Sequence, residues 1–255
     1  MCLIFISLHH HPDYKVIIAA NRDEFYNRST AAAAFWPDRP GVLAGRDLEA
    51  GGTWLGMNKS GRFGMLTNYR DPGSINPNAP SRGALVLDFL TSQESPHAYL
   101  STVSQAGNHY NGFNLLVGNP EQLYYYSNYG NGIEELRSGF YGISNKLLDS
   151  PWPKVVRGKQ MLGPAMAQAT PDIEEILDLL YDQQIAPADQ LPETGLSKDR
   201  ERALSSMFIK TENYGSRCST VVLIDKNDDV TFSERVYDTE TFAHSTNTFR
   251  FTIAP

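Results

Sequence analysis

The residue with the clearest chemical potential stands directly after the initiator methionine. The chain opens MCLIF, and a methionine aminopeptidase would leave Cys2 as the first residue, because that enzyme acts when the next side chain is small. The freed α-amine, with an ordinary pKa of about 7.7–8.0, could then take the proton of the thiol, whose ordinary pKa is about 8.5. Cys2 is therefore a candidate N-terminal nucleophile that carries its own base.

Four consecutive polar residues, Asn21, Arg22, Asp23 and Glu24, follow the second apolar run. The apolar runs 3–8 and 15–20 flank HHHPDY, which has turn chemistry, so they predict a β-hairpin. Antiparallel pairing would bring the polar tetrapeptide beside the start of the chain. A carboxylate there could hold an α-ammonium group, and a guanidinium could lower a thiol pKa and orient a substrate carboxylate or carbonyl. The alternative is a solvated turn without a chemical role.

The elements that would position these residues follow a regular order. Helices are expected as two pairs, around 85–90 and 99–103 and then at 154–168 and 171–181, with a weaker helix around 198–207. Thr170 is the expected N-cap of the 171–181 helix, with Pro171 at its first position. Besides the hairpin, strands are expected at 41–44, 53–58, 63–68, 114–117, 123–127, 139–144, 218–225, 230–236 and 248–253.

Strands, two helices, strands, two helices and strands are the order of an α+β protein. Single alternating βα units are absent, which argues against a parallel doubly wound sheet. Helices that come in pairs indicate that they cover the outer faces of packed antiparallel sheets. The sequence therefore predicts one domain, residues 1–255, with a four-layer αββα sandwich of two mainly antiparallel sheets.

The composition limits which classes of partner and which location are expected. The 255 residues are 41% hydrophobic and 20% charged, with a net charge of -7 and no basic cluster, so nucleic acid is not an expected partner. No window approaches the 18 apolar residues of a membrane span, and the run 3–8 is too short for a signal peptide. Without an export signal, the expected location is a reducing cytoplasm, where Cys2 and Cys218 are thiols.

Longer motifs add a family resemblance. They are MCLIF, IIAANRDEFYNR, GGTWLG, LTNYR, YNGFNLL, YGISN followed by PW, and YGSR followed by VVLID and VTFSER. Together they resemble the NRDE family, also called the transport and Golgi organisation 2 family, from Met1 to the last strand. More distantly, the arrangement is similar to the choloylglycine hydrolases and penicillin V acylases, which are cysteine amidases with an N-terminal nucleophile.

The amidase resemblance implies roles for several residues. The leading cysteine matches Cys2 and the aspartate after the second strand matches Asp23. The nearby arginine corresponds to Arg22, although its order and spacing differ from the amidase pattern. Glu24 has no counterpart in the amidases, and it is expected, together with Asn21, to serve the ligand of the NRDE family itself.

Three later residues complete the amidase comparison. Asn68 in GMLTN and Asn145 in SNKLLDSPW match two asparagines, whose side-chain N–H groups would stabilise an oxyanion. Arg217 in YGSRCST matches a late arginine that would brace the Cys2 thiolate.

Aromatic and histidine side chains have two readings each. Trp54 and Trp152 either line an apolar ligand pocket or pack in the core. His9, His10 and His11 are weak candidate ligands for a haem iron, as is Cys2, but the position of the three histidines at a hairpin tip favours exposed side chains without a role. No dedicated metal site is predicted.

Two functions follow from these residues. The first is a cysteine amidase or acyl transferase that needs no cofactor and acts on a C–N bond other than a peptide bond, in a small amide with an apolar acyl part. The second, implied by the NRDE resemblance, is a non-catalytic binding and trafficking protein for haem, acyl-CoA or another lipid, because a fold does not fix a function. A purely structural interaction protein is a third and weaker reading.

Overall fold

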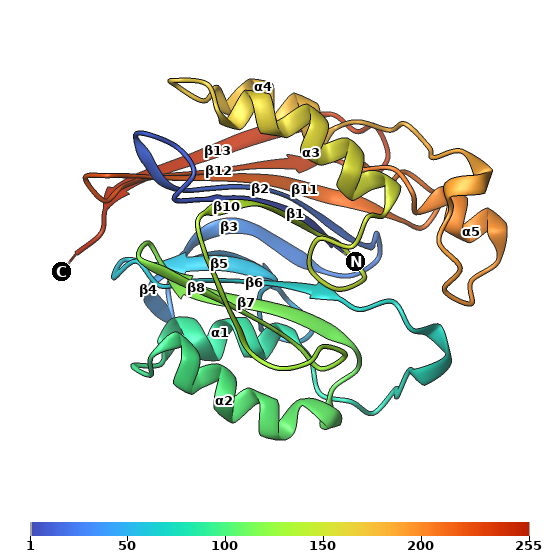
Figure 1. The fold of residues 1–255 in the computed structure, drawn as a ribbon, viewed down its shortest axis with the longest axis horizontal. Helices are drawn as coiled ribbons and strands as arrows, with labels where there is room; N and C mark the ends of the chain where they lie inside the picture. The colour runs from blue at the N-terminus through green and yellow to red at the C-terminus, as the bar shows by residue number, and fades with distance from the viewer. Residues whose placement is uncertain (1, 255) are drawn as a thin grey trace.

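Two antiparallel sheets lie face to face between two pairs of helices (Figure 1). The structure is a computed structural model and describes residues 2–254. The first sheet, sheet A, contains β1 (Cys2–Leu8), β2 (Tyr14–Phe25), β10 (Gly139–Ile143), β11 (Tyr214–Asp225), β12 (Asp229–Tyr237) and β13 (His244–Thr252) in the order β10-β1-β2-β11-β12-β13.

The second sheet, sheet B, has seven strands that follow the order of the chain. They are β3 (Thr30–Trp36), β4 (Arg39–Asp47), β5 (Leu55–Asn58), β6 (Phe63–Asn68), β7 (Phe113–Asn119), β8 (Gln122–Ser127) and β9 (Glu134–Leu136). The helices are α1 (Gly83–Thr91), α2 (Pro96–Ala106), α3 (Pro153–Met166), α4 (Ile173–Leu180) and the short α5 (Lys198–Ala203). Single 3-10 turns occupy Pro72–Ser74, Gly107–His109 and Ala188–Gln190. In the described part of the chain, no helix is both long and apolar enough to cross a membrane.

Three apolar layers separate the four layers of secondary structure. Ile4 and Ile6 of β1 contribute to the core between the sheets, whereas Leu3 and Phe5 of the same strand pack under α3 and α4. A third core lies between sheet B and the pair α1 and α2. This alternation is what a strand buried on both faces requires. The predicted four-layer αββα sandwich is confirmed.

The predicted hairpin is confirmed, but its second strand is longer than expected. Cys2 pairs with Arg22 across the hairpin, and β2 continues through the polar tetrapeptide to Phe25 because β11 pairs with it on the other side. The expectation that Asn21 to Glu24 follow the strand was therefore wrong. Asn21, Arg22 and Asp23 are buried strand residues rather than members of a solvated turn.

Three smaller expectations also differ from the structure. Strand β3 was not predicted because its alanines have low strand propensity, and β9 was missed because it has only three residues. Helix α4 begins at Ile173 with Asp172 as its N-cap, so the assignment of Thr170 and Pro171 was wrong. The Asp172 carboxylate accepts the N–H groups of Glu174 and Glu175, and this cap is stronger than a threonine without such bonds.

Candidate functional site

The site begins with a row of side chains that crosses sheet A. Cys2 of β1 pairs with Arg22 of β2, and Arg22 pairs with Cys218 of β11. Residues that are directly opposite in neighbouring strands point to the same face of a sheet, so all three face the space between the two sheets. A β-bulge between Ser216 and Cys218 inserts Arg217 as an extra residue, which brings Arg217 to the same cavity as Cys218.

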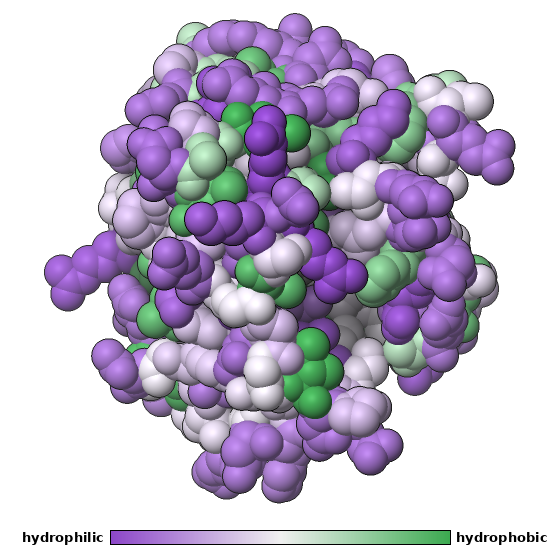
Figure 2. Space-filling view, turned by 90° about the vertical axis from the view of Figure 1, so that its right-hand side faces the viewer, coloured by the Kyte–Doolittle hydropathy of each residue, from purple (hydrophilic) through white to green (hydrophobic). Residues whose placement is uncertain are grey.

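This row forms one wall of a cavity of about 640 Å³. The opposite wall comes from sheet B and from the loop before α1. Figure 2 views the molecule from the end that lies on the right of Figure 1 and shows a hollow with polar and apolar groups at its rim. The lining residues that carry charge, sulfur or an amide are Cys2, Arg22, Asp23, Glu24, Arg28, Arg46, Asp47, Asn68, Arg82, Asn111, Arg217, Cys218 and Glu234.

The thiol of Cys2 is nearly buried, with 6% of the residue exposed. Burial raises its pKa above the ordinary value, and the nearby Asp23 carboxylate adds to the increase, whereas the Arg22 guanidinium opposes it. Cys218 is buried to the same extent, and burial together with the Glu234 carboxylate raises its pKa well above the ordinary value. The Arg22 guanidinium lowers the pKa of both thiols, and the carboxylate that raises the pKa is Asp23 at Cys2 and Glu234 at Cys218.

The carboxylate of Asp23 lies almost fully buried at the bulge. It accepts a hydrogen bond of 2.6 Å from the Ser216 hydroxyl. Burial raises its pKa, and the positive charge of Lys154 opposes this increase most strongly. Asp23 is thus an acid whose ionised form depends on its neighbours.

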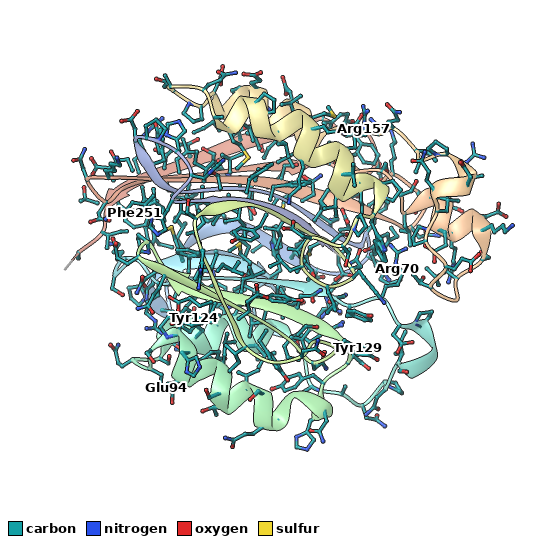
Figure 3. The ribbon with its side chains drawn as sticks, in the orientation of Figure 1. Arg70, Glu94, Tyr124, Tyr129, Arg157 and Phe251 are labelled. Carbon is teal, nitrogen blue, oxygen red and sulfur yellow. The ribbon has the colours of Figure 1, made fainter. Side chains whose placement is uncertain are left out.

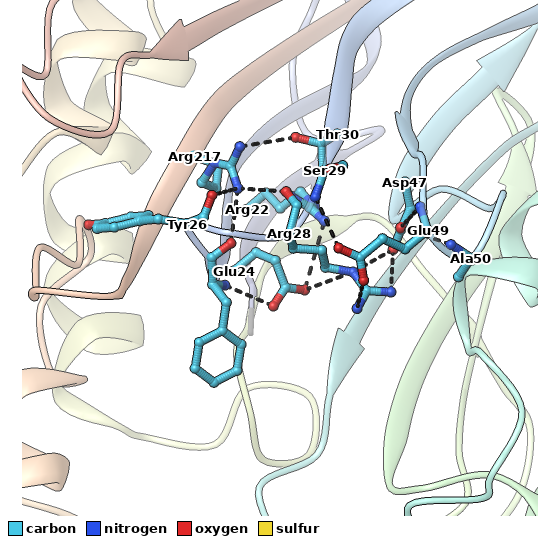
Figure 4. A network of polar contacts seen from close by, with 11 residues as sticks. Arg22, Glu24, Tyr26, Arg28, Ser29, Thr30, Asp47, Glu49, Ala50 and Arg217 are labelled. Atoms are coloured by element: carbon cyan, nitrogen blue, oxygen red, sulfur yellow. Dashed lines mark hydrogen bonds and ion pairs between the residues drawn. The ribbon is translucent and has the colours of Figure 1, made fainter.

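Arginine and carboxylate groups form a network along the rim of the cavity (Figure 4). Glu24 lies 3.8 Å from Arg22 and 3.9 Å from Arg28, and Arg28 also makes an ion pair of 2.8 Å with Asp47. Arg217 donates to the carbonyl oxygens of Phe25, Tyr26 and Arg28 and to the hydroxyl of Thr30. Arg217 therefore fixes the turn between β2 and β3 as well as lining the cavity.

The two asparagines of the amidase comparison occupy different positions. Asn68 ends β6 and lines the cavity together with Cys2. Asn145 is fully buried behind it, and its carboxamide donates 2.9 Å to the carbonyl oxygen of Asn68. Asn145 also receives a hydrogen bond from Ser144 and, at its carbonyl, one from the backbone of Arg70. Asn145 thus holds the backbone at Asn68.

Asn21 lies on the helix-covered side of sheet A rather than in the cavity. Its amide donates to the carbonyl oxygens of Leu180 and Met207, and its oxygen accepts from Ser219. These three bonds join β2 to the end of α4 and to the segment before β11. The expectation of ligand contact at Asn21 is corrected, because its carboxamide is directed to protein partners.

The candidate tryptophans and histidines lie in different parts of the structure. Trp54 lines the cavity, whereas Trp152 packs with the core under α3 and α4 and its ring lies 4.7 Å from the Arg70 guanidinium. His9 and His10 are exposed, but His11 is buried and bonds through its ring to the Gln168 carbonyl and to the Asp13 N–H. Among residues 2–254 no group of three or more histidine, cysteine or acidic side chains could hold a metal ion.

A second cavity of about 710 Å³ adjoins the first. Five residues line both: Glu24, Phe25, Asn68, Arg82 and Asn111. Its remaining wall comes from the segment 69–75, from α5 with its flanking residues and from the start of β11. The apolar side chains there, Tyr69, Ile75, Leu196, Leu204 and Tyr214 among them, make this cavity more apolar than the one that contains Cys2.

Comparison with known proteins places the chain among relatives. The family model for transport and Golgi organisation 2 matches residues 1–239. The chain belongs to the transport and Golgi organisation 2 family. The mouse transport and Golgi organization 2 homolog is 38% identical and the human homolog 36%, each over 99% of both chains, and the Drosophila melanogaster protein is 31% identical over 92% of this chain and 91% of its own.

Solved structures with a similar arrangement include two hydrolases. A Caenorhabditis elegans N-acylethanolamine-hydrolyzing acid amidase ortholog is 11% identical, with a TM-score of 0.49 over 87% of this chain and 92% of its own. A mutant of the conjugated bile acid hydrolase from Clostridium perfringens is 10% identical, with a TM-score of 0.43 over 99% of this chain and 97% of its own. Both TM-scores lie below 0.5, so neither likeness indicates the chemistry of this chain.

Several residues in and around the site were not predicted from the sequence. Arg82, at the junction of the two cavities, stands just after a loop rich in proline and asparagine, and nothing in its local pattern marks it. Glu234 of β12 is buried, and its carboxylate accepts the N–H of Ala33 from the opposite sheet. Lys154 follows Trp-Pro at the start of a helix, where a lysine is ordinarily exposed.

Proposed function

We propose that this member of the transport and Golgi organisation 2 family is a cysteine amidase or acyl transferase with Cys2 as its nucleophile. The substrate class is a small amide with an apolar acyl part, and the bond is a C–N bond other than a peptide bond. Met1 lies outside the described residues, and its removal is part of this proposal. A cytoplasmic location remains a prediction.

One observation carries the proposal. The Cys2 thiol lines a cavity together with Arg22 and Asn68, and this cavity shares a wall with a second, more apolar one. An amide bound with its carbonyl at Cys2 could extend its acyl part into the apolar cavity. Sites of this kind, apolar with a few convergent polar groups, are the usual places for small-molecule chemistry.

The proposed reaction has two halves. In the first, the α-amine of Cys2 takes the thiol proton, the thiolate attacks the carbonyl carbon, and the tetrahedral oxyanion collapses to a thioester. The leaving amine receives the proton from the α-ammonium group. In the second, water attacks the thioester, gives the carboxylic acid and returns the proton to the thiol. Another amine or alcohol in place of water would make the reaction an acyl transfer.

The proposed roles follow the positions of the residues. Arg22, beside Cys2 in the strand register, would favour the thiolate, and Asn68 would donate to the oxyanion. Asn145 would act through Asn68, because its carboxamide bonds to the Asn68 carbonyl. Arg217 would keep the turn after β2 in place, and Glu24 would hold Arg22 at the rim.

A second candidate function is a non-catalytic carrier of a hydrophobic ligand such as haem, acyl-CoA or another lipid. The volume of the apolar cavity and the raised thiol pKa of Cys2 favour it, because a buried protonated thiol is a weak nucleophile. For haem, Cys2 is the residue of the cavity that would hold the iron. His9 to His11 follow the far end of β1, roughly 20 Å along a seven-residue strand from Cys2.

The test combines mass measurement with chemical trapping. Intact mass first determines whether the purified chain has lost Met1. The protein is then incubated with a series of N-acyl amides of increasing acyl length, and a hydroxylamine-sensitive acyl adduct on the N-terminal peptide is sought by peptide mass mapping. Cys218 is the internal control in the same molecule, because its pKa is raised further and its thiol should stay unmodified.

The outcomes separate the two candidates. An adduct on Cys2, lost in Cys2→Ala, supports the amidase or transferase. Retention of Met1, or no adduct and no amide cleavage at any acyl length, refutes it. A haem titration gives the carrier its own readout: a Soret shift that weakens in Cys2→Ala supports haem binding through this residue, and no shift excludes haem as the ligand.

A further inference from the structure

A buried lysine that interacts electrostatically with Cys2 and Asp23 has no part in the mechanism above. Lys154 is the second residue of α3 and is only 2% exposed. Among the residues that the structure describes, no hydrogen-bond partner lies within reach of its Nζ atom. A buried ammonium without a hydrogen bond is costly, and lysine is almost never fully buried unless it is paired. This position therefore requires an explanation.

Charged groups from four different elements surround Lys154. They are Asp23 of β2, Cys2 of β1, Arg70 after β6 and Glu201 of α5. All four are buried. Arg70 and Glu201 form an ion pair with each other, and the Arg70 guanidinium also lies over the ring of Trp152, which caps α3. Figure 3 labels Arg70 at the end of the sandwich where α5 lies.

The pairing within this cluster leaves Asp23 as the counter-charge of Lys154. Glu201 is engaged with Arg70 and with Thr194, whose N–H and hydroxyl it accepts. Asp23 has the strongest favourable influence on Lys154, and Lys154 in turn is the strongest group that favours the ionised form of Asp23.

We propose that Lys154 is a positioning residue that offsets the Asp23 carboxylate near Cys2 and so keeps Cys2 easier to deprotonate. A bare carboxylate beside Cys2 would disfavour its thiolate, and after loss of Met1 it would also hold the α-amine as ammonium. The lysine charge acts in the opposite direction on both groups. This inference deepens the proposed function and rests on it for its catalytic meaning.

The test measures the thiol of Cys2 rather than turnover. The rate of alkylation of Cys2 by iodoacetamide is followed by peptide mass mapping from about pH 6 to pH 10, a range that brackets the ordinary thiol and amine values. The variant is Lys154→Met, which keeps the length of the side chain and removes its charge. The matched control is Lys159→Met on the same helix, where the ammonium is ion-paired with Asp149 at the surface.

We expect alkylation of Cys2 in Lys154→Met to be slower by about tenfold near pH 7, where the wild-type lysine carries its charge, and this difference should shrink above about pH 8, where the lysine loses that charge. The Lys159→Met profile should match the wild type. In an Asp23→Asn background, Lys154→Met should slow alkylation near pH 7 less, because the carboxylate that it offsets is gone.

Other outcomes overturn the inference. A Lys154→Met protein with a lower melting temperature but an unchanged alkylation rate near pH 7 has lost only a structural residue. An equal slowing in Lys159→Met points to a general charge effect. The amidase proposal fails separately: slower alkylation in Lys154→Met without any amide cleavage by the wild type retains the role of Lys154 but excludes the reaction, and cleavage with an unchanged alkylation rate does the reverse.

Discussion

The polar tetrapeptide contains one residue whose contribution to stability can be separated from chemistry. Asn21 is fully buried and donates to the carbonyl oxygens of Leu180 and Met207 at 2.9 and 3.0 Å. Asn21→Ala leaves both carbonyl groups buried without this donor. An orphaned buried polar group costs about 1–3 kcal/mol, so the free energy of unfolding should fall by about 2–6 kcal/mol. Ser219 keeps its second partner, Tyr237, and adds little.

The assay is urea denaturation followed by tryptophan fluorescence, with Asn27→Ala as the control. Asn27 lies in the turn just after β2 and is exposed, so the same substitution there should change the free energy of unfolding by less than about 0.5 kcal/mol. Under native conditions, the alkylation rate of Cys2 in Asn21→Ala should remain near that of the wild type. If Asn21→Ala were as stable as the control and had lost Cys2 reactivity, Asn21 would act in the chemistry and its structural assignment would be wrong.

Two further predictions concern the helix α3. Burial lowers the pKa of Lys154 from 10.5 to about 8, so between these values the unfolded chain binds a proton that the folded chain does not, and stability rises with pH. At 1.36 kcal/mol per pH unit, the free energy of unfolding of the wild type should rise by about 3 kcal/mol relative to that of Lys154→Met across this range. Denaturation at several pH values measures this difference, and parallel stability curves for the two proteins would contradict the prediction. The stability curve of Lys159→Met should run parallel to that of the wild type. In the second prediction, Gly158→Ala places a Cβ 2.0 Å from the Phe5 ring and should lower stability by about 1–3 kcal/mol in the same assay. Gly163→Ala, whose Cβ would meet nothing closer than 3.4 Å, should be neutral or slightly stabilising, and equal effects at both glycines would refute the steric argument.

The fold could be predicted because its signals are local. Apolar runs with turn residues between them define most strands, and the grouping of helices in pairs defines the layers. Strand β3 was not predicted, because TAAAAFW has no alternation and only one β-branched residue, Thr30, and it forms a strand through its pairing with β4. The extension of β2 was not predicted for a related reason. The strand that pairs with the polar tetrapeptide and buries it, β11, lies nearly 200 residues later in the chain.

The candidate site could be predicted in part for the same reason. The proximity of Cys2 to Arg22 follows from the register of one hairpin, which the sequence specifies. The positions of Asn68 and Asn145, one in the cavity and one behind it, depend on how two sheets pack, and no spacing in the sequence encodes that. Lys154 is the extreme case, because its burial results from the docking of α3 on sheet A.

The tetrapeptide links the two halves of the molecule because it lies within a strand rather than after one. Arg22 and Glu24 line the cavity, whereas Asn21 bonds to the helix layer behind it. Asp23, at the bulge, accepts a hydrogen bond from Ser216, and its carboxylate is stabilised by the positive charge of Lys154 in that helix layer. One short strand segment therefore carries the charges that face a ligand and the contacts that fix α3 and α4. Within the tetrapeptide, changes at Arg22, Asp23 or Glu24 should therefore alter how readily Cys2 is deprotonated, whereas a change at Asn21 should lower stability alone.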